Sequence, residues 1–307
     1  MEVWGDLMKE VNKPSILEAN ILYFILGIIL FFLGSLVQSR EIYSGLLITE
    51  YLIILVPNLI FLKLKGLPLK TTLRLNKINL RQIIYIALIM LFSYPIAAFL
   101  NTIVITILNL FGETVVSSVP IPDSGKKYLL SLFVIGLSPG ICEEIMFRGT
   151  IMRAYESMGK KKAIIYSSIL FGIFHLNLQN LIGPIFLGFI LATILYKTNS
   201  IYASMLGHGI SNTIAMTLGY LTTRFQGTVE NVQGLEIPYM VQLLMALLWL
   251  SIIALISSVA LIKLIRRLPG DEVVIKEVEE KIKLSDFFPI VLIIILFIII
   301  HVKYLYL

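Results

Sequence analysis

Long apolar runs dominate the chain, and charged residues, glycines and prolines separate them. A run of about 20 apolar residues can cross the hydrocarbon core of a bilayer as a helix. Three consecutive runs, 163–177, 181–196 and 201–221, are separated from one another by only three or four residues. Such short connections favour close helix packing. The pattern predicts an all-α fold, a polytopic membrane helical bundle of about eight or nine transmembrane helices. The expected helices lie at about 16–37, 42–62, 83–111, 128–147, 163–177, 181–196, 201–221, 238–262 and 287–307.

Composition supports a membrane protein. The 307 residues are 58% hydrophobic and 14% charged, whereas soluble domains have roughly 45–50% apolar and about 25% charged residues. Little sequence is left for a water-soluble core. Residues 1–15 contain three acidic residues and no apolar stretch, so we expect no cleaved signal peptide there. The first apolar run is expected to act as an uncleaved insertion signal.

The basic residues predict how the helices are oriented. If the N-terminus is cytoplasmic and all nine runs cross the membrane, 20 of the 25 Lys and Arg residues lie on the cytoplasmic side. This distribution follows the positive-inside rule. The net charge of +6 therefore reflects topology, and no nucleic-acid partner is expected. We predict a multi-pass integral protein, with its N-terminus in the cytoplasm, in the cell membrane.

Two hydrophilic stretches interrupt the apolar pattern. Residues 65–82 place leucines among basic residues with no acidic residue. This pattern fits an amphipathic helix on an anionic cytoplasmic leaflet, and it fits an ordinary basic loop equally well. Residues 266–286 mix both charge signs and are most simply a solvated linker.

The first candidate site is a pair of glutamates in the fourth run. Glu144 and Arg148 are four residues apart, so they share a helix face and can pair, whereas Glu143 faces elsewhere. Pro139, with Ser138 as a candidate N-cap, predicts a break or a kink near mid-membrane, with a helix N-terminus that points at the carboxylates. The alternative is a simple ion pair at the cytoplasmic end of a helix.

Two of the three histidines lie in predicted helices beside glycine and other small residues, which permit close helix approach. His175 follows Phe171 by four residues, and His208 precedes Asn212 by four. A lone intramembrane histidine is commonly an interhelical hydrogen-bonding group, but a glutamate and two histidines from three helices can bind a metal or position one water. His301, near the chain end, is interpreted as an interfacial residue without a catalytic role.

Missing motifs narrow the chemistry. The sequence has no His-Glu-x-x-His and no Gly-x-Ser-x-Gly, which disfavours zincin-type and serine-nucleophile sites. Cys142 is the only cysteine, so an intramolecular disulfide and a Cys-rich metal site are excluded.

The motifs EExxxR, FxxxH and HxxxN, in this order on separate predicted helices, resemble the CPBP family of intramembrane proteases. This family includes type II CAAX prenyl endopeptidases (Ras-converting enzymes) and bacterial proteins of bacteriocin maturation and self-immunity. The motifs fall within 128–216, which we interpret as a catalytic core. Residues 1–127, with the basic segment 65–82, and residues 217–307 supply further transmembrane helices.

The resemblance implies a role for each motif residue. Glu143 would activate the attacking water, which His175 helps to hold, and His208 with Asn212 would stabilise the oxyanion. Three further residues would support them: Glu144, Arg148 and Phe171. The resemblance leaves two mechanisms open. One is a glutamate protease that needs no metal, and the other uses zinc held by Glu143, His175 and His208.

We therefore expect an intramembrane endopeptidase whose cavity opens toward the cytoplasm. Its partner would be a membrane-anchored peptide or a prenylated protein cleaved near a CAAX-type C-terminus. Two alternatives remain: a non-proteolytic self-immunity or partner-binding protein, and a transporter that uses the same residues as a proton relay.

One condition must hold for this site to form. A fourth helix ending near residue 147 would leave Glu143 at the cytoplasmic end, while His175 lies roughly 20 Å deep at about 1.5 Å per residue. The two side chains can meet if the helix continues to around Met158, with Gly159 as its C-cap. The other possibility is a tilt or break of the fifth helix near Gly172.

Overall fold

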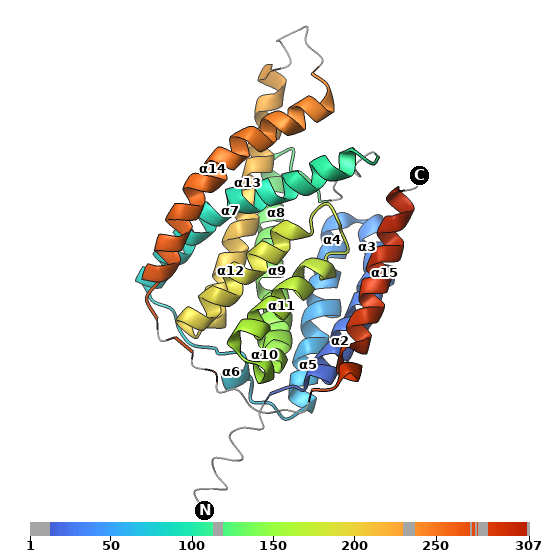
Figure 1. Cartoon of the computed structure of the whole chain (residues 1–307), viewed down its shortest axis with the longest axis vertical. Coiled ribbons are helices and arrows are strands. Elements are labelled where there is room, and N and C mark those ends of the chain that lie inside the picture. Colours follow the sequence, from blue (N-terminus) through green and yellow to red (C-terminus); the bar gives the residue numbers. More distant parts are fainter. Residues whose placement is uncertain are drawn as a thin grey trace, which may run out of the picture.

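The computed structural model describes residues 13–112, 119–229, 237–270, 272–273, 275 and 282–305. Within these ranges the chain consists of helices and short connections, with no strand, and the predicted all-α membrane bundle is confirmed (Figure 1). Residues 1–12, on which the signal-peptide prediction rests, lie outside the described part.

The described helices follow the nine predicted apolar runs in order. The first two runs form α2 (Ile16–Ile29), η1 (Leu30–Gly34), α3 (Ser35–Arg40), α4 (Ile42–Leu47), η2 (Ile48–Leu55) and α5 (Val56–Leu64). The third and fourth form α7 (Leu80–Asn109), α8 (Gly125–Ser131), η3 (Leu132–Leu137), α9 (Ser138–Glu144), η4 (Ile145–Ile151), α10 (Met152–Tyr155) and η5 (Glu156–Met158). The remaining runs form α11 (Lys160–Phe174), α12 (Ile182–Thr198), α13 (Ile201–Val229), α14 (Tyr239–Arg267), η6 (Leu284–Phe287) and α15 (Phe288–Leu305).

The helices differ in whether they can span a bilayer. Six helical stretches of the described chain are long and apolar enough to do so: Ile16–Arg40, Ile42–Leu64, Leu80–Asn109, Gly125–Met158, Tyr239–Arg267 and Leu284–Val302. In contrast, α11 has 15 residues and α12 has 17, fewer than the roughly 20 that a full crossing requires. The structure thus supports a polytopic bundle, and nine full crossings remain a prediction.

The predicted break at Pro139 is wrong. The helix continues through this residue, and Ser138 does not cap a new N-terminus, because its Oγ donates to the carbonyl oxygen of Phe133 at 3.0 Å. The π-helical stretch η3 lies directly before the proline. Its wider turn accommodates a residue that has no N–H to donate. Within the described stretch Gly125–Met158, the chain therefore presents no new helix N-terminus to Glu143 and Glu144.

The predicted extension of the fourth helix is confirmed. The helical stretch reaches Met158, and Gly159 follows it with φ +88°, a conformation that suits glycine. Glu143 precedes Gly159 by 16 residues, and His175 follows it by 16. Because the chain reverses at Gly159, equal helical lengths bring the two residues to the same depth.

The basic stretch 65–82 is not a continuous amphipathic helix. Only α6 (Leu69–Thr72) is helical before α7 begins. Leu67 and Leu73 are buried, and the buried Arg74 pairs with Glu156 at 2.8 Å. This segment therefore packs onto the bundle end through both apolar contacts and an ion pair.

The predicted linker 266–286 is packed at its beginning. Pro269 accepts a hydrogen bond from the Gln82 side chain at 3.1 Å, and the Val273 amide donates to Tyr196 at 2.9 Å. Residues 271, 274 and 276–281 lie outside the described residues. The described beginning of this stretch thus covers the ends of α7 and α12.

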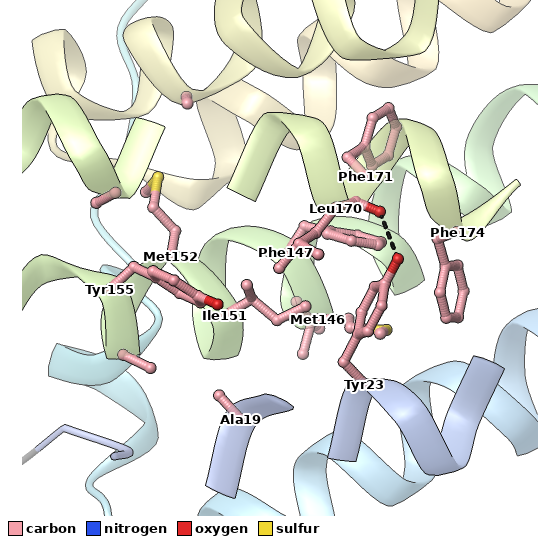
Figure 2. Packing of buried hydrophobic residues seen from close by; sticks show 14 of the residues in the cluster. Ala19, Tyr23, Met146, Phe147, Ile151, Met152, Tyr155, Leu170, Phe171 and Phe174 are labelled. Carbon is pink, nitrogen blue, oxygen red and sulfur yellow. Dashed lines mark hydrogen bonds between the residues drawn. The ribbon is translucent and has the colours of Figure 1, made fainter. Parts of the chain in front are cut away.

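An aromatic core supports the centre of the bundle (Figure 2). The ring of Phe147 lies 5.0 Å from that of Phe171 and 5.5 Å from that of Phe174, measured between centroids. The buried hydroxyl of Tyr23 donates to the carbonyl oxygen of Leu170 at 2.9 Å. These contacts fix α2, η4 and the end of α11 relative to one another.

Candidate active site

Glu144 and Arg148 form the predicted ion pair inside the bundle. The Arg148 Nη1 atom lies 3.2 Å from Glu144 Oε1, and both side chains are 0% exposed. Arg148 Nη2 also donates to the carbonyl oxygen of Gly188 at 3.1 Å. The pair is therefore a buried link between the fourth helix and α12, and not an ion pair at the membrane surface.

His208 extends from α13 to both glutamates. Its Nδ1 donates to Glu144 Oε1 at 3.0 Å, because a carboxylate can only accept. Its Nε2 faces Glu143 Oε2 at 3.9 Å. The buried imidazole thus lies between a carboxylate that is paired with arginine and one that is not.

Close contact between α9 and α13 allows the His208 side chain to approach both glutamates. A Cβ atom added to Gly140 would lie 3.0 Å from both the Gly209 nitrogen and the Met205 oxygen. These are backbone atoms, so the helices could not approach as closely with a larger residue at position 140. Small residues in helix interfaces allow this approach.

His175 caps the C-terminal end of α11. Its Nδ1 donates to the Phe171 carbonyl oxygen at 2.8 Å, so Nε2 is the acceptor nitrogen of the ring. The Phe171 ring lies 5.1 Å from the His175 ring and 5.5 Å from the His208 ring, and the Arg148 guanidinium lies 4.8 Å from its centroid. Phe171 therefore separates the two imidazoles and holds them in place.

A cavity of about 450 Å³ brings Glu143 and His175 together. Apolar and uncharged polar side chains form most of its wall, and its two carboxyl groups, those of Glu50 and Glu143, are buried. Its lining residues are Leu30, Phe31, Ser35, Gln38, Leu46, Thr49, Glu50, Ile54, Glu143, Phe174, His175 and Leu176.

Glu50 is a site residue that the sequence analysis missed. It is buried, it lines the cavity, and its carboxyl group contacts that of Glu143. Within the described residues, Oε2 of each of these two glutamates has no hydrogen-bond donor from the protein. A signal was present, because Glu50 is the only charged residue in the run 42–62, and intramembrane carboxylates are candidates by default.

Asn212 lies one helical turn beyond His208. Its Nδ2 donates to the carbonyl oxygen of Ile135 at 3.0 Å, and Asn212 does not line the cavity. The structure thus brings Glu143, His175 and His208 near one another, whereas the role of Asn212 toward an oxyanion remains a prediction.

The residues proposed for zinc do not fit a metal site in this arrangement. In the described part of the chain, no group of three or more His, Cys, Asp or Glu side chains is placed to hold a metal ion. The Nδ1 atom of His208 is bonded to Glu144, so Nε2, which lies 3.9 Å from Glu143 Oε2, is the only nitrogen of this ring left for a metal.

His301 has a structural contact near the site that the sequence analysis did not assign. Its Nδ1 donates to the Phe297 carbonyl oxygen at 2.7 Å, and its Nε2 accepts from the Leu178 amide at 3.0 Å. One tautomer satisfies both bonds. The last helix therefore holds the loop that follows His175.

Comparison with known proteins identifies the central part of the chain. Residues 125–214 match the family model described as type II CAAX prenyl endopeptidase Rce1-like. This segment is less than a third of the chain and contains all three motifs, while Glu50 lies outside it. No curated protein and no solved structure matches the chain.

Proposed function

Because the match over residues 125–214 supports membership in the CPBP family of intramembrane proteases, we propose that this chain is an endopeptidase that hydrolyses a membrane-anchored substrate. One observation carries the proposal: Glu143 and His175, from different helices, line the same cavity. Glu143 Oε2 has no hydrogen-bond donor from the described residues, and the acceptor nitrogen of His175 is not used by Phe171. Both groups can therefore bind one water molecule.

In the proposed reaction, the carboxylate of Glu143 removes a proton from water while His175 orients it. The oxygen of the water adds to the scissile carbonyl carbon and forms a tetrahedral oxyanion. When the C–N bond breaks, the proton held by Glu143 passes to the leaving nitrogen. The products are a carboxylic acid and an amine, and no group other than water is consumed.

The remaining motif residues support this step in our proposal. Glu144 and Arg148 hold His208 beside Glu143, and Phe171 keeps the two imidazoles apart. By resemblance, His208 and Asn212 stabilise the oxyanion, which requires donors aimed at the developing charge. Because the zinc ligand set does not fit, we propose a glutamate mechanism, and metal chelators are expected to leave the rate unchanged.

We further propose that the protein is a multi-pass protein of the cell membrane with a cytoplasmic N-terminus, from its basic residues. The description of the family model names CAAX prenyl endopeptidases. A prenylated CAAX-type peptide is therefore the first substrate class to test, and a membrane-anchored peptide without a prenyl group is the second.

The test is hydrolysis of both peptide classes by purified protein in detergent. We expect Glu143→Gln and His175→Ala each to lower kcat by at least about 100-fold, the scale of general-base catalysis. The control is Glu18→Gln, at a half-buried glutamate of α2 that does not line the cavity. Activity retained by either folded site variant would exclude the proposed chemistry. If the native protein cleaves neither peptide and Glu143→Gln still protects cells against a bacteriocin, the non-proteolytic alternative holds.

A further inference from the structure

The two ends of the bundle differ in charge. One end, which we call the basic end, contains most of the Lys and Arg residues that the structure describes. It is formed by the connections 65–79, 159–160, 197–201, 268–270 and 272–273. At the other end, which we call the distal end, lie the turn between α3 and α4, the start of α8 and the loop between α11 and α12 (Figure 1).

The cavity lies in the distal half. Ser35 and Gln38 line it from α3, just before the turn at Arg40, and Leu46 lines it just after that turn. His175 lines it at the point where α11 ends, 15 residues from the basic end. Because α11 stops there, the space above it toward the distal end is not filled by this helix.

The basic end is closed by buried contacts. Arg74 and Glu156 are 7% and 3% exposed in their side chains, and Tyr196 donates to Glu156 at 2.9 Å. Buried Leu73 lies against Gly149, and Leu268 is also buried. A substrate entering from this end would have to displace these segments, whereas the distal end already has a cavity.

From this asymmetry we infer that the substrate enters from the distal end and is a peptide segment of a membrane-anchored polypeptide exposed on the extracytoplasmic face. The positive-inside rule places the basic end in the cytoplasm, so the distal end faces the opposite side. The expected cytoplasmic N-terminus and the expected cytoplasmic opening of the cavity are incompatible in this structure. The inference rests on the proposed function for its chemistry, and on the cavity and the charges for the side of entry.

The cavity wall also indicates what kind of segment fits. Leu30, Phe31 and Leu46 offer apolar contacts, and Gln38, two residues before the distal turn at Arg40, offers amide hydrogen bonds. The buried carboxyl groups of Glu50 and Glu143 also line it, and an acidic substrate side chain would be repelled there. An uncharged, largely apolar peptide segment is therefore favoured at the scissile bond.

Cysteine labelling in intact cells tests the side of entry. Cys142 is buried and serves as the unlabelled background. We expect a membrane-impermeant maleimide to label the Gln38→Cys variant in intact cells, and to label Lys77→Cys, at an exposed residue of the basic end, only after permeabilisation. Labelling of Gln38→Cys is further expected to lower hydrolysis at least about tenfold in detergent, since the adduct fills the cavity, while labelling of Lys77→Cys leaves hydrolysis unchanged.

The outcomes separate the two proposals. If Lys77→Cys is labelled in intact cells and Gln38→Cys only after permeabilisation, the inferred side of entry is wrong even where the detergent assay shows hydrolysis. If labelling of Gln38→Cys leaves hydrolysis unchanged, entry of the substrate past residue 38 is wrong. If neither reporter peptide is hydrolysed in detergent, the proposed function fails, whatever the labelling pattern.

Discussion

Glu143 has a different neighbour on each side. His208 approaches one of its oxygens at 3.9 Å, and the carboxyl group of Glu50 contacts it within the cavity. Two carboxyl groups can share a hydrogen bond only when one of them carries a proton. Glu50 is therefore placed to fix the orientation of Glu143, which makes it a positioning residue in our interpretation.

Replacing Glu50 tests this interpretation. We expect Glu50→Ala to lower kcat by roughly 10- to 100-fold, since small displacements of catalytic groups have effects of this size. We expect Glu50→Gln to retain most of the activity, because its amide can still donate to Glu143. The measurement is kcat and KM of the purified variants, with Glu18→Gln as the matched control. Equal loss in Glu50→Gln and Glu50→Ala would contradict the positioning role.

At the scale of single residues, the sequence predicted which residues form the three motifs, but not which side chains from other helices contact them. The spacing of Glu144 and Arg148 was sufficient to predict their pairing, because both lie on one helix. The contact of Glu50 with Glu143 joins residues 93 positions apart, and no local pattern indicates such a partner. The same applies to His301, whose partner Leu178 lies on another element.

Helix interfaces set the distance between the catalytic groups. Gly140 allows α9 to lie directly against the backbone of α13, which brings His208 to Glu143 and Glu144. The π-helical stretches η3 and η4 on either side of α9 rotate the helix faces away from regular α-helical spacing. The sequence predicted a helix and a proline effect here, but the proline widens the turn and does not break the helix.

Substitution of Gly140 should separate these helices. A Cβ atom 3.0 Å from backbone atoms of Gly209 and Met205 has no flexible side chain to displace. We expect Gly140→Ala to cost about 1–3 kcal/mol, to lower Tm by roughly 2–10 °C, and to reduce hydrolysis at temperatures where the variant is folded. Gly125→Ala is the control, because no atom of the described residues lies within 4 Å of its added Cβ. A wild-type Tm and rate in Gly140→Ala would show that the interface adapts.

The loop after His175 depends on the last helix. Because His301 accepts from the Leu178 amide at 3.0 Å, we expect His301→Ala to loosen this loop and to lower kcat about tenfold while the protein remains folded. Limited proteolysis within 176–181 should become faster in the same variant. Unchanged proteolysis and an unchanged rate would mean that other contacts hold the loop. A change in KM alone would point to substrate contact and not to loop position.

At the scale of the whole molecule, buried contacts close the basic end of the bundle, and the distal half contains the cavity. Apolar periodicity and charge were enough to predict the order of the helices and the asymmetry of basic residues, since both follow from burial in a bilayer. The position of the cavity could not be predicted, because it depends on where α11 ends relative to α3 and α4. The closed end likewise depends on a long-range pair, Arg74 with Glu156.

This buried pair provides a test at the scale of the whole molecule. Removing one partner of a buried ion pair typically costs about 3–5 kcal/mol. Glu156 would keep its contacts with Arg153 and Tyr196, so we expect Arg74→Ala to cost about 3 kcal/mol and to lower Tm by roughly 6–12 °C.

The same variant separates stability from catalysis. Because Arg74 does not line the cavity, kcat of the folded variant should equal that of the native protein. Lys77→Ala, an exposed basic residue of the same segment, should change neither quantity. A lower kcat in Arg74→Ala at a temperature well below its Tm would show that the closed end is coupled to the active site. Closure of the basic end would then be part of the catalytic cycle and not only a source of stability.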